Sequence, residues 1–414
     1  MISSRPSEQG HVLVTEGYSA SNIGDLELVT RSVEWVRSVA GPDESVVCLA
    51  VDPDSFRDEM PERFEHRLFP RLRVIGRPRL ARLGIGGLWI MQAAMMSCSA
   101  LLPRGWQLLR WLCGRGLLPA STTYYVDAKR VVAVGGGYLG DQYLKETLTT
   151  LWTWWWAGRL GIQVETLPIS FEVSKQPLRT ATRVLGRSVR WRVRDTLSQQ
   201  RLARIGLKAE FVPDLAFGNF AHGVSEPGVG SVVALVGNDY LHRGEQEALI
   251  EEFTRGAQLG LLPEPVVLVS MHATLSGTHV GADTEMNARL RESLVRSGCN
   301  DVVHVGVDSY SDVLDACSAA EIVISARMHA GIAGLCRGRR TGLLAYEEKH
   351  RALMHDLGLD EFVIGIRDDP VSVVDLLERL RVEPDVTFED AAEQHSRRLE
   401  AALLSSGGER GLDR

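Results

Sequence analysis

The chain has 414 residues, of which 44% are hydrophobic and 24% are charged, and its formal net charge at pH 7 is −7. A chain of this length holds two or three domains with an adequate core, so stability requires neither disulfides nor a structural metal. The net negative charge excludes non-specific nucleic-acid binding as the main function.

The six cysteines are scattered, without a C-x-x-C pair or a His/Cys cluster at metal-ligand spacing. This usage is typical of core cysteines in a reducing compartment, and it predicts no metal site. The opening residues, MISSRPSEQGHVLV, lack the basic region and apolar run of a signal peptide. We therefore expect a cytoplasmic protein.

The N-terminal half begins with a βαβ pattern. Alternating and helical hydrophobic periods predict strand His11–Thr15, loop Glu16–Asp25, a helix from about Leu26 to Ala40 and strand Ser45–Val51. Asn22 and Gly24 lie in the loop, where a sugar or phosphate is commonly held. Asp25, taken alone, is better explained as an N-cap of the helix.

Residues 52–125 form an irregular insert. Within it, Leu83–Pro103 has no charged residue over a length that suffices to span a bilayer, and Arg82 and Arg104 flank it. Its Gly, Ser and Gln content makes it only mildly apolar, so we expect a buried or surface-docked helix rather than a transmembrane one. A docked helix would give peripheral contact with the inner face of the membrane, near a lipid-linked substrate.

Polar motifs follow the later strands of this half. Strand Val131–Val134 precedes Gly135–Gly137, which either lets a ligand approach the backbone or makes a tight turn before a helix from about Asp141 to Ala157. The four tryptophans near the end of that helix indicate burial or an interface with a second copy. Strand Gln163–Ile169 leads to loop residues 170–172, and strand Arg190–Val193 leads to Arg194.

Beyond a Gly/Pro/Ser-rich linker, strands and helices alternate again. We predict an α/β fold with a parallel sheet in each half, giving two Rossmann-like domains that face each other across a cleft. The predicted organisation is an N-terminal domain over 1–222, a linker over 223–230, a C-terminal domain over 231–385, and a helix and tail over 386–414.

Arg327 and His329 follow the predicted strand Ile322–Ser325, where a parallel strand leads into a helix. Open α/β sheets bind ligands at this edge, and a guanidinium there suits a phosphate or carboxylate. Helix-end amides attract an anion beside His329, which makes the imidazole a candidate proton donor. The alternatives are that Arg327 pairs with a structural carboxylate and that Arg194 pairs with Asp214.

The order and spacing of these motifs resemble the polysaccharide pyruvyl transferase family. The resemblance covers roughly Val12–Gly358 and rests on the following motifs: Asn22-x-Gly24-Asp25, Gly135-Gly136-Gly137, Arg194-Asp195-x-x-Ser198 with Pro213-Asp214, and Ser325-x-Arg327-x-His329 with Tyr346-x-x-Lys349.

The resemblance implies a fold similar to that of the GT-B glycosyltransferases, with the acceptor held by the N-terminal domain and the donor by the C-terminal one. It implies transfer of the enolpyruvyl group of phosphoenolpyruvate to a sugar diol, which forms a ketal and releases phosphate without a metal or other cofactor. The expected catalytic residues are His329 and Asp25. The expected donor-binding residues are Arg327, Arg194, Lys349 and Ser325, and the expected acceptor-binding or backbone-binding residues are Asn22, Gly24, Gly136, Gly137 and Asp141.

Two other functions fit the same pattern. A GT-B glycosyltransferase would use the same arginines and lysine to hold the diphosphate of a nucleotide sugar. A catalytically idle family member would act as a binding component of a glycan pathway. Either way, we expect small-molecule and carbohydrate partners rather than nucleic acid.

Overall fold

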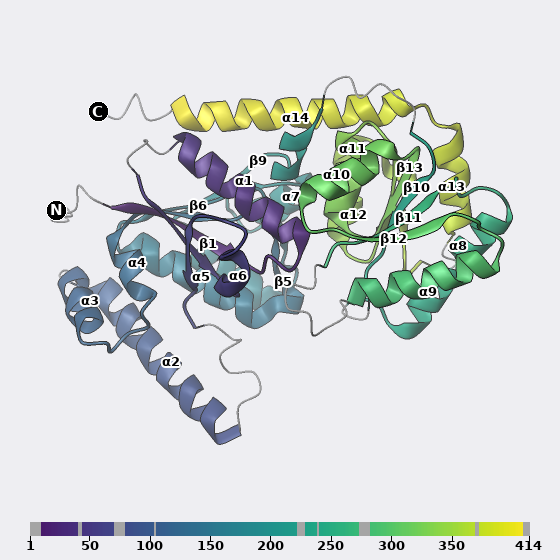
Figure 1. The fold of residues 1–414 in the computed structure, drawn as a ribbon. Helices are drawn as coiled ribbons and strands as arrows, with labels where there is room; N and C mark the ends of the chain where they lie inside the picture. The colour runs from purple at the N-terminus through teal and green to yellow at the C-terminus, as the bar shows by residue number, and fades with distance from the viewer. Residues whose placement is uncertain are drawn as a thin grey trace. The chain divides into compact units, whose positions relative to one another are not determined.

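The computed structural model describes residues 10–39, 44–69, 79–102, 105–221, 228–237, 240–272, 282–368 and 372–408. The chain divides into two compact units (Figure 1). The first comprises residues 1–20, 28–193 and 198–211, and the second comprises residues 21–27, 194–197 and 212–414. Residues 223–227 of the expected linker lie outside the described ranges.

The first unit begins with the predicted βαβ arrangement. Strand β1 (His11–Gly17) pairs in parallel with β2 (Val46–Ala50), and helix α1 (Ile23–Val39) connects them. Leu28, Val29, Val33 and Val36 of α1 are buried, because their spacing puts them on one face of the helix. The strands and helix predicted from periodicity are confirmed here, with small shifts at their ends.

The sheet of the first unit has the strand order β3-β2-β1-β4-β6-β8-β7-β5, with β9 paired to β8, and the pairings are parallel. Its other strands are β3 (Arg63–His66), β4 (Ala128–Ala133), β5 (Gly136–Gly140), β6 (Gln163–Thr166), β7 (Ile169–Glu172), β8 (Val189–Val193) and β9 (Ala209–Phe211). The helical segments are η1 (Pro53–Phe56), α2 (Arg79–Leu101), α3 (Gly105–Gly114), α4 (Thr122–Asp127), η3 (Asp141–Tyr143), α5 (Leu144–Arg159), α6 (Gln176–Leu185) and α7 (Thr196–Arg204).

Two loop predictions in this unit were wrong. Gly136 and Gly137 begin strand β5 instead of forming a turn into a helix, and residues 170–172 lie in strand β7 instead of a loop. These two short strands pair with each other, since Gly136 lies opposite Ile169. The hydrophobic pattern could not show this pairing because β5 is made of three glycines, a tyrosine and a leucine.

Tryptophans of α5 form part of the core of the first unit. Trp154 and Trp156 are fully buried, as the sequence indicated. Trp156 Nε1 donates a hydrogen bond to the carbonyl of Met96 in α2 at 3.0 Å, and Trp152 Nε1 donates one to Ser97 Oγ, also at 3.0 Å. One face of α2 is therefore fastened to α5.

The second unit has the strand order β12-β11-β10-β13-β14-β15, with parallel pairings and helices on both faces of the sheet (Figure 1). Its strands are β10 (Ser231–Ala234), β11 (Val266–Ser270), β12 (Val302–Gly306), β13 (Ile322–Ser325), β14 (Arg340–Ala345) and β15 (Val363–Gly365). Its helical segments are η4 (Leu215–Asn219), α8 (Arg243–Gln258), α9 (Ala282–Arg296), α10 (Tyr310–Ala319), α11 (Met328–Cys336), α12 (Glu348–Leu357), η5 (Asp360–Phe362), α13 (Val373–Val382) and α14 (Asp385–Gly408). The chain thus has an α/β fold built from two parallel sheets.

Two segments from the first half of the sequence group with the second unit. Residues 21–27 are held there by a hydrogen bond from the Ile23 amide to the Met271 carbonyl at 3.0 Å. Residues 194–197 are held by a hydrogen bond from the Thr196 amide to Asp356 Oδ2 at 2.8 Å. Both segments carry motifs that the sequence analysis had assigned to the N-terminal half.

Candidate active site

The candidate site lies at the switch point of the second unit's sheet. On one side of β10 the chain continues to β11 and β12. It then returns to β13 on the other side of β10 and continues outward to β14 and β15. Ligands of open α/β sheets bind at the carboxyl ends of the strands where the order reverses in this way. Ser325, the last residue of β13, lies opposite Ala234 of β10, so the turn that follows it is at this position.

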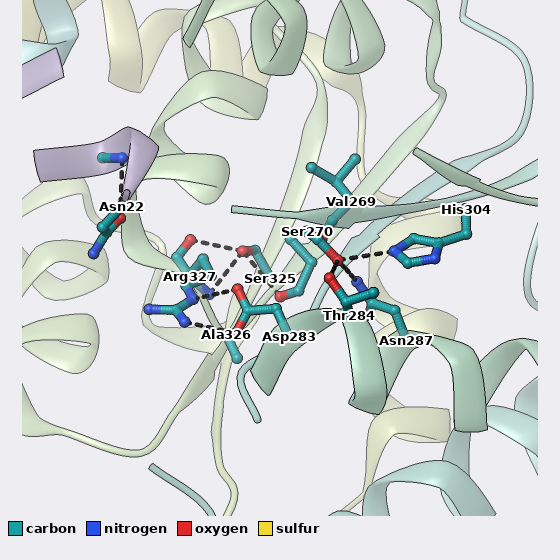
Figure 2. Close-up of polar contacts among 12 residues, drawn as sticks. Asn22, Val269, Ser270, Asp283, Thr284, Asn287, His304, Ser325, Ala326 and Arg327 are labelled. Carbon is teal, nitrogen blue, oxygen red and sulfur yellow. Dashed lines mark hydrogen bonds and ion pairs between the residues drawn. The ribbon is translucent and has the colours of Figure 1, made fainter. Parts of the chain in front are cut away.

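Ser325 shapes that turn. Its hydroxyl accepts a hydrogen bond from the amide of Arg327 at 3.0 Å and donates one to the carbonyl of Arg327 at 2.6 Å (Figure 2). The side chain is fully buried. The hydroxyl therefore fixes the backbone at the start of α11, and its expected contact with a donor stays a prediction.

Arg327 is the N-cap residue of α11 and only 6% exposed. Its Nε and Nη2 donate to the two carboxylate oxygens of Asp283 in α9, at 3.0 and 2.6 Å (Figure 2). Burial disfavours the charge, but the Asp283 carboxylate raises the pKa of Arg327, which stays protonated. The carboxylate pairing considered from sequence is thus present. Within the described ranges, Nη1 has no hydrogen-bond acceptor and is left for a ligand.

His329 lies one residue into α11, with 14% of its side chain exposed. Gly24 lies against its ring, because a Cβ added to Gly24 would be 2.3 Å from His329 Nδ1. The hydroxyl of Tyr310 donates to the His329 carbonyl at 2.8 Å. Among the described residues, no hydrogen-bond partner meets Nε2, which is buried. The imidazole is thus held on one side by Gly24 while Nε2 keeps its hydrogen-bonding capacity.

Asp214 connects His329 to Arg194. Arg194 Nη1 donates to Asp214 Oδ2 at 2.6 Å, and His329 Nε2 is 3.8 Å from the same oxygen, which is too long for a hydrogen bond. Burial alone would raise the pKa of Asp214, but Arg194 and then His329 hold it well below its usual range. Asp214 is therefore a permanent carboxylate behind the imidazole, as in arrangements that orient a catalytic histidine.

Asp25 lies in the first turn of α1, which begins at Ile23, so the expectation that it is the N-cap was wrong; its side chain is partly buried. Burial raises the pKa of its carboxyl group, and the charges of His329, Arg327 and Lys349 act against that rise. None of the described residues forms a hydrogen bond or ion pair with this carboxylate. Asp25 therefore lies near these three side chains, and it forms no ion pair with any of them.

Lys349 reaches the site from α12. Its Nζ forms an ion pair with Glu347 and lies 5.9 Å from the ring centroid of Tyr346. The side chain is 16% exposed. Lys349 is therefore already paired with a carboxylate, and its expected contact with a donor stays a prediction.

The structure brings the expected residues of the second unit together. His329, Arg327, Lys349 and Asp25 interact electrostatically, and Arg194 joins them through Asp214. Asn22 accepts a hydrogen bond from the Gly24 amide at 3.1 Å (Figure 2). Its backbone forms a bridge with His272. Asn22 and Gly24 thus position α1 and the imidazole.

The remaining expected residues belong to the first unit. Gly136 has a φ of 143°, which favours glycine, and Gly137 follows it in β5. Asp141 accepts hydrogen bonds from the Ser174 hydroxyl and from the Ser174 and Lys175 amides. Burial alone would raise its pKa, but these bonds, the hydroxyl first, lower it. These contacts give Asp141 a role in holding the turn at 174–175. Acceptor binding by the three residues stays a prediction.

Sequence reasoning missed several residues of the site. Asp283 was given no role from the sequence, and 44 residues separate it from Arg327. Tyr240 lies with its ring centroid 5.0 Å from the Arg327 guanidinium. The two ring nitrogens of His350 lie 3.1 Å from the Glu347 and Ala326 carbonyls, and burial, followed by Lys349, lowers its pKa to about 4, so the neutral ring donates to one of them. No local pattern indicates such contacts, because they arise between separate βα units.

No group of three or more His, Cys, Asp or Glu side chains suited to a metal ion occurs among the described residues. Within the same ranges, one helical segment, Gly84–Leu101 in α2, is long and apolar enough to cross a membrane, and 22% of this segment is buried.

Solved structures with the same fold come from sugar-active enzymes. A putative UDP-N-acetylglucosamine 2-epimerase from Listeria monocytogenes has a TM-score of 0.54 at 10% identity, covering 98% of each chain. A sucrose-phosphate synthase from Thermosynechococcus elongatus has a TM-score of 0.53 at 11% identity, covering 96% of this chain and 97% of that one. At such identities the likeness shows the fold alone, which is the GT-B type expected from the sequence.

No curated protein matches the chain. The family model described as polysaccharide pyruvyl transferase, in contrast, matches residues 22–348, which include every candidate residue of the second unit except Lys349. A match over this much of the sequence shows the family. The chain therefore belongs to the polysaccharide pyruvyl transferase family, which is a family of transferases.

Proposed function

We propose that the protein transfers the enolpyruvyl group of phosphoenolpyruvate to two hydroxyls of a sugar, forming a pyruvate ketal and releasing phosphate. The observation that carries the proposal is the group formed by Asp25, His329, Arg327 and Lys349 at the sheet's switch point. It combines two anion-binding cations with an acid–base pair. Membership of the family supports pyruvylation of a carbohydrate in general.

Phosphoenolpyruvate carries a carboxylate and a phosphate, so its site must offer at least two separate cationic or amide-rich contacts. Arg327 Nη1 and the first amides of α11 would bind one anionic group, because both lie at the amino end of that helix. Lys349 would bind the other. Arg194 acts through Asp214, because its Nη1 donates to that carboxylate.

The chemistry needs one proton donor and one proton acceptor. Protonation of the methylene carbon turns the double bond into a methyl group and leaves positive charge on the neighbouring carbon, to which the first hydroxyl adds, losing its proton. The second hydroxyl then forms the second C–O bond, the bond to phosphate breaks, and a base takes the remaining proton. The imidazole of His329 suits proton delivery, and the Asp25 carboxylate suits proton uptake.

A ligand-dependent shift in melting temperature tests the donor. Bound at a hundred times its dissociation constant, a ligand that binds only the folded state adds about 2.7 kcal/mol to the free energy of unfolding. Phosphoenolpyruvate should stabilise the wild type. Arg327→Lys keeps a charge beside Asp283 but loses the forked geometry, so it should bind the donor about tenfold more weakly.

The matched control is Arg340→Lys, because Arg340 is also an ion-paired arginine of the second unit, with Glu321 and Asp385 as partners. It should bind phosphoenolpyruvate as the wild type does. His329→Ala should keep donor binding and release no phosphate when a panel of sugar diols is added. Stabilisation by UDP-sugars or GDP-sugars alone would instead make the protein a glycosyltransferase, and no response to either class would indicate an idle family member.

A further inference from the structure

Helix α2 carries an apolar stripe that the first unit does not cover. The exposed positions recur with helical spacing, so they form one face of the helix: Gly84, Gly87, Leu88, Met91, Ala94, Cys98 and Leu101. Ile90 beside the stripe is 74% exposed, and Met91 is 52% exposed. A surface helix of a globular domain ordinarily has polar residues on this face.

The opposite face of α2 is part of the core. Met96 and Ser99 are fully buried, and hydrogen bonds from Trp152 and Trp156 hold the helix at Ser97 and Met96. A helix that crossed a bilayer would have to leave these partners, which would strand buried indole groups. The packing is compatible with a helix that lies on a membrane with only its outer stripe immersed.

The charge of the sequence around α2 indicates which kind of surface this stripe would bind. Residues 66–126 contain no aspartate or glutamate, although the whole chain has a net charge of −7. The same 61 residues contain nine arginines: Arg67, Arg71, Arg73, Arg77, Arg79, Arg82, Arg104, Arg110 and Arg115. An apolar stripe within a strongly cationic segment complements an anionic lipid surface, where apolar side chains enter the acyl boundary and arginines meet phosphate groups.

Helix α3 packs on α2 and also exposes apolar side chains. Trp111 is 49% exposed, and the Arg115 guanidinium lies 4.2 Å from its ring centroid. Leu117 beyond the helix is 44% exposed. Tryptophan and arginine side chains are favoured at the level of lipid headgroups, because each combines an apolar body with a polar tip.

We propose that the α2–α3 face, comprising the stripe of α2 together with Ile90, Trp111 and Leu117, docks on an anionic membrane. Lipid phosphates interact with Arg115, whose guanidinium lies over the Trp111 ring, and the apolar stripe enters the interface in the plane of the membrane. This docking rests on the first unit alone and is independent of the donor that the second unit binds.

Vesicle sedimentation tests the docking with the full chain. The wild type should pellet with phosphatidylcholine vesicles that contain phosphatidylglycerol, should not pellet with pure phosphatidylcholine, and should be released as salt rises. The double substitution Ile90→Glu/Met91→Glu should weaken binding to the anionic vesicles by about tenfold or more, because carboxylates enter neither the apolar layer nor the negative surface.

The matched control is Val382→Glu/Leu404→Glu, which places the same charges on side chains that are 82% and 78% exposed in the second unit. Because these charges are not on the α2–α3 face, the variant should bind the anionic vesicles within about twofold of wild type. Circular dichroism melting confirms that both double variants are folded. An environment-sensitive fluorophore on the exposed Cys98, in a Cys113→Ser background, should shift to the blue only with anionic vesicles.

Three results would overturn the proposal. They are an absence of binding to anionic vesicles at low salt, equal loss in both double variants, and a fluorophore at Cys98 that stays in water while the protein is bound. Sedimentation equilibrium covers the competing occupant: a dimer that only Ile90→Glu/Met91→Glu dissociates, without vesicle binding, would assign the face to a second copy of the chain.

Discussion

At the scale of single residues, Gly24 explains how the imidazole is placed. The space beside His329 Nδ1 is closed to any side chain, because an added Cβ would be 2.3 Å from that atom. The glycine in the Asn22-x-Gly24-Asp25 motif is thus required by close approach to a histidine more than three hundred positions further along the chain. Its sequence context indicated only a loop suited to ligands.

Gly24→Ala should therefore displace His329 and lower the rate of phosphate release by about 100-fold, with the fold retained. Steady-state kinetics beside a urea unfolding curve separate the two effects. Gly244→Ala in α8 is the control, since nothing lies within 4 Å of a Cβ at that position and alanine favours the helix. Equal activity of the two variants would contradict the packing role of Gly24.

Asp25 predicts a pH-dependent difference in stability. Its pKa in the folded protein is raised by burial, so the folded state holds the proton more firmly than the unfolded state does. This contribution is fully present below the ordinary aspartate pKa and is lost as pH rises through the raised one. Asp25→Asn removes it and should gain stability relative to wild type over that rise.

Urea midpoints of wild type and Asp25→Asn, measured in parallel from acid to neutral pH, check this sign. Groups other than Asp25 titrate alike in both proteins and cancel in the difference to first order. A difference that stays constant across the range would mean that the Asp25 pKa is not raised. Phosphate release by the variant should be lost while phosphoenolpyruvate still stabilises it.

At the scale of elements, the arginine on the β13–α11 turn depends on a carboxylate from α9. Asp283 is fully buried and binds two guanidinium nitrogens, so Arg327 has a fixed orientation before any ligand arrives (Figure 2). Such preorganisation lowers the entropy cost of binding an anion. It also means that Arg327 serves structure and ligand together.

Asp283→Ala should destabilise the protein by about 3–5 kcal/mol, because it leaves a buried cation without a partner. Phosphoenolpyruvate should restore part of this loss, since its anionic group would compensate the cation. Asp312→Ala, which removes an exposed capping carboxylate of α10, is the control and should cost only about 0.5–2 kcal/mol. Full stability of Asp283→Ala would show that the pair contributes nothing to the fold.

At the scale of the whole molecule, the two compact units carry different chemistry. The second unit contains the residues for which acid–base chemistry and anion binding are proposed, including segments 21–27 and 194–197 from the first half of the sequence. The first unit contains a cationic, apolar face on α2 and α3. If both proposals hold, one unit fastens the protein to the membrane and the other carries out the transfer.

The sequence by itself determined the α/β class, most strands and helices, the family resemblance and the residues of the β13–α11 turn. These follow from hydrophobic period and short-range motifs, which are local properties of the chain. The Gly136–Gly140 strand was missed, because glycines carry no hydrophobic signal.

Only the tertiary structure decided which residues meet. It brought Asp283 to Arg327, Asp214 to both Arg194 and His329, and Gly24 to the imidazole ring. These contacts depend on the order of strands in a sheet and on side chains that point across it from different βα units. Local propensity carries no information about such pairings, because the free energy that selects them comes from burying all of the units together.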